Sequence, residues 1–281
     1  MQNLIKNIDG NVITLENQFV YSYKIEDRPV LIRVRLAENV SVKSISVTSK
    51  DKKATKGIEA RLSRNLTVAD LTVKGIQNAI FVTDSIAPRI ISNTITDNGR
   101  AVRGQAGLQI FNCLEAEIRE NKLKRSGAIW IRNNINSRII RNTSDNTRPT
   151  NGDGISVVNT VNCIFDSNTI LNANCYGIWI KNDSRNNTIS NNRFSKGITS
   201  GIYLTHGAQE NLISNNITSN NAGNGIFVAA EADRNIIRDN LVERNQGRGI
   251  LVHGKQNTLS GNTALKNGIE QIKIQPGNFI K

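Results

Sequence analysis

The chain has 281 residues, of which 36 are lysine or arginine and 23 are aspartate or glutamate, giving a formal net charge of +13. No apolar stretch is long enough to cross a bilayer, and the first residues lack the basic-then-apolar pattern of a secretory leader, so we expect no membrane span and no membrane partner. The charge favours anionic partners, although scattered lysines and arginines also keep a repetitive protein soluble. The absence of a basic stripe with interleaved aromatic residues argues against nucleic acid.

The first 40 residues do not follow the pattern of the rest of the chain. Within them, residues 11–15 and 30–36 read as strands. We assign residues 1–40 to an N-terminal cap and first strands, because the open end of a stacked fold must be covered. Farther on, the polar segments 49–56 and 143–152 are expected to form loops, and such insertions often build the binding face of a solenoid.

A short phrase, Gly-Ile-x-Val or a close variant, then returns about every 24 residues, a spacing typical of a stacked repeat. Its clearest copies begin at Gly154, Gly177, Gly201, Gly225 and Gly249. The other half of each repeat carries a phrase of the type Asn-x-Ile-x-x-Asn. Its last asparagine recurs as Asn93, Asn121, Asn142, Asn168, Asn192, Asn216, Asn240 and Asn262. Both phrases place apolar residues at alternate positions, which is the period of a β-strand.

A repeat of this length, with two or three short strands and Asn/Gly turns, is typical of one coil of a parallel β-helix. No hexapeptide period of the left-handed kind is present. We therefore expect an all-β fold, a single-stranded right-handed parallel β-helix, as one domain over residues 1–281. Residues 41–264 would form the coils and residues 265–281 would close the C-terminal end. The recurring asparagines are expected to adopt left-handed backbone and to stack as a hydrogen-bonded ladder, and the repeated glycines to serve a similar corner.

These two phrases, over residues 57–262, make the chain similar to the β-helix repeats of the NosD and pectate-lyase-like superfamily, which includes carbohydrate-active β-helix proteins. The resemblance implies a polysaccharide groove along the outer strand face. It specifies the architecture strongly and the activity poorly, so the residues on that face must carry the functional prediction.

The x of Gly-Ile-x-Val points outward, so stacked coils align it as a column. That column reads Gln109, Trp130, Ser156, Trp179, Tyr203, Phe227 and Leu251. We expect its aromatic rings to stack on sugar rings, and neighbouring cations to bind carboxylates or sulfates. The predicted substrate-binding residues are Trp130, Trp179, Tyr203, Phe227, Arg132, Lys181, Arg248 and His253. A protein–protein or trimer interface, or cover from elsewhere in the chain, would also explain an aromatic strip.

The candidate catalytic residues are His206, Asp153, Asp183 and Tyr176. Register places His206 between Asp183 and Glu231, about 5–8 Å from each carboxylate, where a histidine can act as acid or base. Asp153 lies in a segment similar to the Asn-Thr-Asp-Gly motif of polygalacturonase-type glycosidases. However, Asp153 and Asp183 fall about 23 Å apart along the strand direction, whereas paired glycosidase carboxylates lie about 5–10 Å apart.

A lyase or epimerase would need a base and a group that neutralises the substrate carboxylate. Tyr176 or His206 could supply the base, and Arg132 or Lys181 the positive charge. The Asp-Pro-His motif of alginate-epimerase-like β-helices and the calcium-binding acidic cluster of pectate lyases are both missing.

The sequence thus predicts a protein that binds an acidic polysaccharide, with cleavage or epimerisation left open. The alternative is a non-catalytic structural or adhesive β-helix, such as a phage tail or spike component, for which a homotrimer is an option. A periplasmic accessory protein like NosD is a third reading, to which the missing leader is an objection. We expect no metal and no cofactor, and read Cys113, Cys163 and Cys175 as packed free thiols. The compartment stays open, with an extracellular or virion-associated location favoured by the fold.

Overall fold

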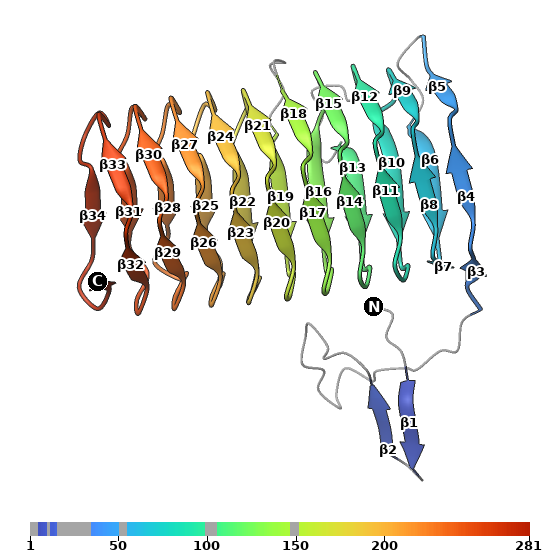
Figure 1. The fold of residues 1–281 in the computed structure, drawn as a ribbon, viewed down its shortest axis with the longest axis horizontal. Coiled ribbons are helices and arrows are strands. Elements are labelled where there is room, and N and C mark those ends of the chain that lie inside the picture. The colour runs from blue at the N-terminus through green and yellow to red at the C-terminus, as the bar shows by residue number, and fades with distance from the viewer. Residues whose placement is uncertain (1–4, 10–11, 16–34, 51–54, 99–105, 147–151) are drawn as a thin grey trace.

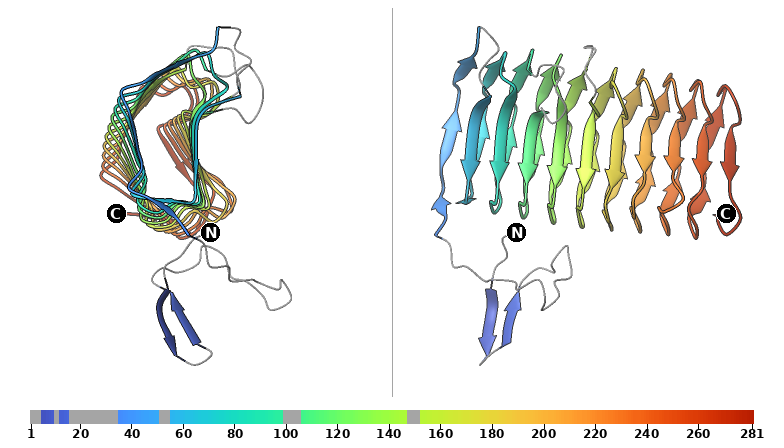
Figure 2. Two further views of the ribbon diagram at one scale, coloured as in Figure 1. Left: turned by 90° about the vertical axis from the view of Figure 1, so that its right-hand side faces the viewer. Right: turned by 180° about the vertical axis from the view of Figure 1, so that it is seen from behind.

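The computed structural model describes residues 5–9, 12–15, 35–50, 55–98, 106–146 and 152–281. From residue 35 onward the described residues form short strands joined by turns, with no helix among them. Successive coils stack side by side into a rod (Figure 1). Seen along the rod, the coils follow one another with nearly the same outline, which is the architecture of a parallel β-helix (Figure 2). The all-β solenoid expected from the repeat is confirmed.

Three long parallel sheets run along the rod, and each complete coil contributes one strand to each of them in turn. The first sheet contains β6 (Lys56–Arg61), β10 (Asn78–Thr83), β13 (Ala106–Phe111), β16 (Ala128–Arg132), β19 (Ile155–Val158), β22 (Ile178–Lys181), β25 (Ile202–Leu204), β28 (Ile226–Val228), β31 (Ile250–Val252) and β34 (Ile272–Ile274). The Gly-Ile-x-Val phrases lie in this sheet, so it carries the predicted functional face.

The second sheet holds the strands of the Asn-x-Ile-x-x-Asn phrases. It contains β4 (Ser41–Lys43), β8 (Thr67–Ala69), β11 (Arg89–Ile91), β14 (Glu117–Arg119), β17 (Arg138–Ile140), β20 (Ile164–Asp166), β23 (Thr188–Ser190), β26 (Leu212–Ser214), β29 (Ile236–Arg238), β32 (Thr258–Ser260) and β35 (Phe279–Ile280).

The third sheet follows the ladder asparagines and returns the chain to the first sheet. It contains β5 (Ser46–Thr48), β9 (Thr72–Lys74), β12 (Thr94–Thr96), β15 (Lys122–Lys124), β18 (Thr143–Asp145), β21 (Thr169–Leu171), β24 (Arg193–Ser195), β27 (Ile217–Ser219), β30 (Leu241–Glu243) and β33 (Thr263–Leu265). Two short strands, β3 (Ala37–Glu38) and β7 (Ser63–Arg64), pair in parallel at a turn.

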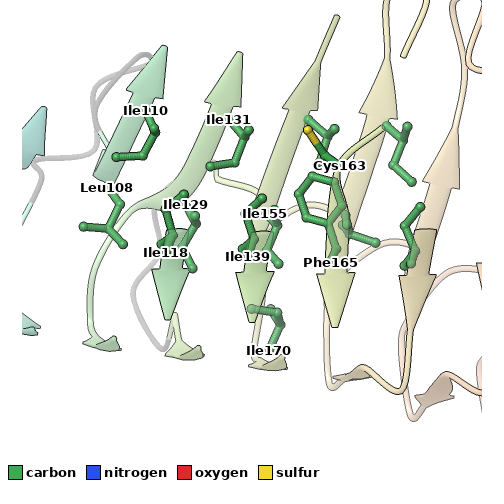
Figure 3. Close-up of a cluster of buried hydrophobic side chains, with 14 of the residues drawn as sticks. Leu108, Ile110, Ile118, Ile129, Ile131, Ile139, Ile155, Cys163, Phe165 and Ile170 are labelled. Carbon is green, nitrogen blue, oxygen red and sulfur yellow. The ribbon is translucent and has the colours of Figure 1, made fainter. Parts of the chain in front are cut away.

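The interior of the rod is a continuous apolar column to which all three sheets contribute (Figure 3). Ile129 and Ile155 point inward from the first sheet, Ile139 and Phe165 from the second, and Ile170 from the third, all with 0% of their surface exposed. A single coil cannot bury such side chains on both of its faces, so each coil depends on its neighbours for stability.

A ladder of buried asparagines links the coils where the second sheet ends. The side-chain amide of Asn121 donates to the side-chain oxygen of Asn142 at 2.9 Å and to the carbonyl of Ile90 at 2.9 Å. The expected ladder is therefore confirmed, but its expected backbone conformation is wrong. The residue before each rung, such as Glu120 (φ 58°) or Arg141 (φ 53°), has the left-handed backbone. The residue before the rung turns the corner while the asparagine points inward.

The repeated glycines are needed for a different reason than the one expected. Gly177 and its equivalents are not in the left-handed region, whereas Gly207 and Gly261 are. A Cβ on Gly177 would lie 2.5 Å from the carbonyl oxygen of Gly201 and 2.8 Å from Cβ of Phe194. Close approach of the next coil and of the core excludes a side chain at this position.

The structure describes only parts of the N-terminal strands and loops that the sequence predicts outside the regular coils. Residues 11–15 correspond to β2 (Val12–Leu15), which pairs antiparallel with β1 (Ile5–Asp9). Most of the other predicted N-terminal strand (30–34 of 30–36), and parts of both predicted loops (51–54 and 147–151), lie outside the described residues, and the cap assignment for 1–40 stays a prediction.

The predicted loop 143–152 begins too early, because residues 143–145 form β18 with Ser144 turned inward and 0% exposed. At the other end of the chain, residues 265–281 complete β33 and add β34 and β35 to the stack. No helix among the described residues is long and apolar enough to cross a membrane.

Candidate functional site

The outward side chains of the first sheet form the column expected from the repeat. Trp130 pairs with Ser156, Ser156 with Trp179, Trp179 with Tyr203, and Tyr203 with Phe227 on successive strands. The four aromatic side chains are half-buried, while the apolar residues on either side of each point into the core. Stacking in register thus brings side chains about 24 residues apart in sequence into one strip.

In the C-terminal half of the strip the rings lie against one another. Trp179 and Tyr203 stack with centroids 6.1 Å apart and an angle of 17°, and Tyr203 and Phe227 with 4.9 Å and 15°. Tyr176 leans on both, 5.3 Å from Trp179 and 4.5 Å from Tyr203. We call these four residues the aromatic ladder. Each contact of this geometry stabilises by about 0.5–1.5 kcal/mol beyond burial.

This stacking changes how the strip can meet a ligand. The rings of the ladder follow one another along the rod, so Tyr203 has a neighbouring ring on each side. Its edge and hydroxyl group, rather than an open ring face, are therefore turned outward. The sequence predicted aromatic rings that stack on sugar rings, because a repeat pattern gives the positions of aromatic residues but not the orientation of their rings.

A second, smaller aromatic group lies on the N-terminal side of Ser156. Phe111 meets Trp130 edge-on at 5.4 Å and Phe81 at 5.5 Å. Lys56 and Arg61 place their charges 5.3 and 5.4 Å from the Phe81 ring centroid. Phe81 and Phe111 were not among the predicted site residues, although their places in the outward columns of the register could have indicated them.

Asp153 lies just before β19, and its carboxylate accepts the backbone N–H of Tyr176 at 3.4 Å. Burial raises the pKa of Asp153 above its ordinary value, and the ammonium of Lys181 and hydrogen bonds from Tyr176, Cys175 and Ser156 offset only part of that effect. The chain thus holds a carboxyl group with increased affinity for a proton on the outward face, which is the property of a general acid.

The groups around Asp153 are half-buried, as Asp153 itself is. Burial raises the pKa of Tyr176 to about 12, with help from nearby negative charge, so this phenol is a proton donor rather than a base at neutral pH. Burial, the charge of Asp153 and a hydrogen bond to it raise the pKa of Cys175 to about 11. The sequence predicted Cys175 only as a packed thiol. Its position next to Tyr176, on the coil after Asp153, could have indicated the contact with Asp153.

Lys181, at the end of β22, folds back over the neighbouring aromatic ring. Its ammonium nitrogen lies 3.1 Å from the ring centroid of Trp179, a cation–π contact. The same ammonium attracts Asp153 on the preceding coil. The structure therefore brings together Asp153, Tyr176, Trp179 and Lys181, four of the predicted site residues.

His206 and Asp183 lie beyond the other end of these strands. The N–H of Asp183 donates to the carbonyl of His206 at 3.1 Å, and both side chains are exposed. The pKa of Glu231 is lowered, first by its own backbone N–H and then by Thr205, by the His206 backbone and by the His206 charge, which together outweigh the opposing effect of burial. Glu231 is thus the carboxylate linked to His206. The imidazole lies 6.5 Å from Trp179, at the edge of the ladder.

The remaining predicted binding residues surround the ladder more loosely. His253 meets Phe227 edge-on at 5.5 Å, so both histidines of the chain contact the aromatic ladder. Arg132 is exposed on β16. Arg248 is already paired, with its guanidinium 2.6 Å from the carboxylate of Glu270. No group of three or more metal-ligating side chains occurs in the part of the chain that the structure describes.

Comparison with solved structures finds the same architecture in two epimerases and in a tailspike protein. The A-module of the mannuronan C-5 epimerase AlgE6 of Azotobacter vinelandii aligns with a TM-score of 0.67 and 11% identity, over 88% of this chain and 84% of that one. A mutant of the periplasmic alginate epimerase AlgG aligns with 0.59 and 16%, over 75% of this chain but 59% of that one. The Dettilon tailspike protein aligns with 0.52 and 16%, over 85% and 61%.

Such low identities show a shared fold and nothing finer. No curated protein matches the chain in sequence. The family model described as a right handed beta helix region matches residues 56–208 and 127–279, which confirms the expected hand of the solenoid. The chain belongs to the right-handed β-helix family.

Proposed function

We propose that the outer face of the first sheet binds an acidic polysaccharide along the rod. The observation that carries this proposal is the aromatic ladder of Tyr176, Trp179, Tyr203 and Phe227, flanked by the cations Lys181 and Arg132 on the same face. Apolar ring surface binds the C–H faces and edges of sugars, while ammonium and guanidinium groups bind carboxylates. A periodic rod matches a periodic polymer, because each coil offers a similar set of contacts.

The solved neighbours support a carbohydrate ligand. Two of them are epimerases of mannuronan or alginate by name, and a DFA-IIIase of Arthrobacter chlorophenolicus aligns with a TM-score of 0.52 and 16% identity over 78% of this chain and 62% of that one. The net charge of +13 supports an anionic ligand. The proposal assigns binding to Trp130, Trp179, Tyr203 and Phe227 and charge neutralisation to the cations beside them.

A catalytic version of the proposal uses the buried end of the same face. Asp153, with its raised pKa, would donate a proton, assisted by Tyr176, and Lys181 or Arg132 would neutralise a substrate carboxylate. His206, whose charge acts on Glu231, would be the exposed acid or base at the far edge of the ladder. Asp183 lies at that far edge too, so it forms no pair with Asp153.

The binding proposal is tested by calorimetry with oligomers of mannuronate, galacturonate and chondroitin. Trp179→Ala removes the ring next to Lys181, and we expect a loss of affinity of about tenfold or more, in line with the removal of a central aromatic contact. Phe279→Ala is the matched control, because this 54% exposed ring lies on β35 in the second sheet. Equal binding by the parent and by both Trp130→Ala and Trp179→Ala would exclude this face as the binding site.

A non-catalytic adhesive rod is the second candidate. It is favoured by the separation of the candidate acids, since Asp153 precedes its strand and Asp183 follows β22, about 23 Å away along the strand direction. The similarity to a tailspike supports the same candidate. Mass measurement in solution and incubation with the three polymers separate the two. A trimer that binds without making unsaturated, epimerised or shortened products supports the adhesive rod, and new products support the enzyme.

A further inference from the structure

The coil that carries Ser156 interrupts the aromatic column. Ser156 pairs with Trp130 on one neighbouring strand and with Trp179 on the other. The backbones that carry the two indoles are thus two coil spacings apart, about 10 Å along the rod. Two aromatic side chains at that separation can hold one further ring between them at about 4–5 Å from each, close to van der Waals distance.

In the free protein this position is covered. Ser156 and Val158, the outward residues of that coil, are 6% and 7% exposed. Tyr203 stacks on Trp179 from the following coil, whereas Asp153, which attracts Lys181, belongs to the preceding one. The Lys181 ammonium, 3.1 Å from the centroid of the Trp179 ring, therefore covers the indole face turned toward Ser156.

The two indoles share a second property. The N–H groups of Trp130 and Trp179 are hidden from solvent, and neither has an acceptor among the described residues. A buried donor without an acceptor is unfavourable. A ligand oxygen that lies in the plane of either indole, beyond the sugar ring stacked on its face, would supply a missing acceptor once the cover moves.

We propose that the position over Ser156 is a subsite for one uronate ring, and that Lys181 is its displaceable cover. This inference rests on the proposed function and adds the feature of the polymer that is recognised, a free carboxylate on the ring bound between Trp130 and Trp179. Arg132 and Lys181 occupy the same outward column on the two sides of Val158, so a carboxylate there meets both cations.

Displacement of Lys181 links charge recognition to stacking. The sugar carboxylate takes the ammonium away from Trp179, and the uncovered indole face then stacks on the same sugar ring. A neutral or methyl-esterified ring has no carboxylate that could replace the contacts of the ammonium with Trp179 and Asp153. The cover therefore favours free uronate over its ester. The expected difference in affinity between the two is larger than the contribution of one ion pair.

The first experiment compares oligogalacturonate with its fully methyl-esterified form, and mannuronate oligomers with theirs, by calorimetry. We expect the parent to prefer the acid at least tenfold, and Lys181→Met to reduce that preference to about twofold or less. Lys122→Met is the matched control, since this exposed lysine lies on β15 in the third sheet, and it should keep the parental preference. A Lys181→Met protein with an unchanged acid-to-ester ratio would overturn the subsite. A parent that binds none of the oligomers would refute the proposed function together with it.

The second experiment needs no ligand. The chain has two tryptophans, so in a Trp130→Phe background Trp179 is the sole indole. Adding Lys181→Met should shift and intensify its emission, because a charged ammonium no longer lies on the ring, whereas Lys122→Met should leave the spectrum unchanged. An identical spectrum with and without Lys181 would refute the cover even if the polymer binds elsewhere on the face.

Discussion

Asn192 and Asn216 occupy the same place on neighbouring coils, and the side-chain amide of Asn192 donates to the side-chain oxygen of Asn216 at 3.0 Å. Asn192 also donates to the carbonyl of Phe165 at 2.8 Å and accepts both the backbone and the side-chain N–H of Asn168. One side chain that is 1% exposed thereby satisfies polar groups of both neighbouring coils at a corner where the strands cannot pair them.

Asn192→Ala should therefore destabilise the rod strongly. The change leaves buried donors on Asn168 and the acceptor of Phe165 without partners, and we expect a loss of about 3 kcal/mol in the free energy of unfolding. Urea denaturation followed by circular dichroism measures it. Asn262→Ala is the control, because this rung on the penultimate coil is only half-buried and water can replace its contacts. Equal losses in the two variants would contradict a ladder whose strength depends on burial.

The repeated glycine of the first sheet yields a second prediction. In Gly177→Ala the new Cβ would lie 2.5 Å from the Gly201 carbonyl oxygen, so the coils must shift apart, and we expect a loss of about 1–3 kcal/mol. Gly152→Ala has nothing within 4 Å of its Cβ and should leave the stability unchanged within error. Thermal unfolding of the two variants side by side tests whether close packing explains the recurrence of glycine. If alanine lowered stability at any glycine position, both variants would lose stability.

Register was the part of the structure that the sequence could predict. The return of Gly-Ile-x-Val is enough to align Trp179, Tyr203 and Phe227, because strand alternation and a constant coil length leave one arrangement. The asparagine ladder followed in the same way. The left-handed backbone was predicted at the ladder asparagine but occurs one residue before it. Asparagine is common both at left-handed turn positions and at buried ladder positions, so the sequence pattern does not distinguish the two.

Side-chain direction was the part that the sequence could not predict. Lys181 could have pointed to solvent from its outward column, but it lies over Trp179 instead, where the ring and the carboxylate of Asp153 both attract its ammonium. The same limit hid the stacking of the ladder rings and the contact between Asp153 and Cys175. Each depends on torsion angles about side-chain bonds, which a repeat pattern does not encode.

Asp153 should make the stability of the protein depend on pH. Burial raises its pKa in the folded state, so between its unfolded value, about 3.9, and the higher folded value the folded protein binds more protons. Stability therefore falls as pH rises through that window. Asp153→Asn removes this dependence, and relative to the parent it should gain stability from pH 4 upward until the folded pKa is passed. Denaturant titrations at several pH values measure the difference.

Asp166 provides a control of opposite sign for that experiment. Burial acts to raise its pKa, but hydrogen bonds from Ser190, Ser167 and Asn191 outweigh burial and lower it. Its contribution is present above the unfolded pKa and is lost as pH falls through the folded one. Asp166→Asn should therefore lose stability relative to the parent at neutral pH. If both variants shift in the same direction, the assignment of a buried, proton-binding carboxyl to Asp153 is incorrect.

Cys175 reports on the same carboxylate by its reactivity. Burial and the charge of Asp153 raise its pKa to about 11, and burial raises those of Cys113 and Cys163 to about 12. At pH 8 a thiol with a pKa of about 8.5 is substantially ionised, whereas all three of these should react slowly with an aromatic disulfide reagent until the protein is unfolded. Cys175 is the half-buried one, so it should react first, and Cys175→Ser should abolish the slow native phase.

Asp153→Asn removes a negative charge beside the sulfur of Cys175 and should accelerate that phase severalfold, while Asp166→Asn should not. A native rate indifferent to Asp153→Asn would mean that the carboxylate carries no charge at this pH or does not act on the thiol.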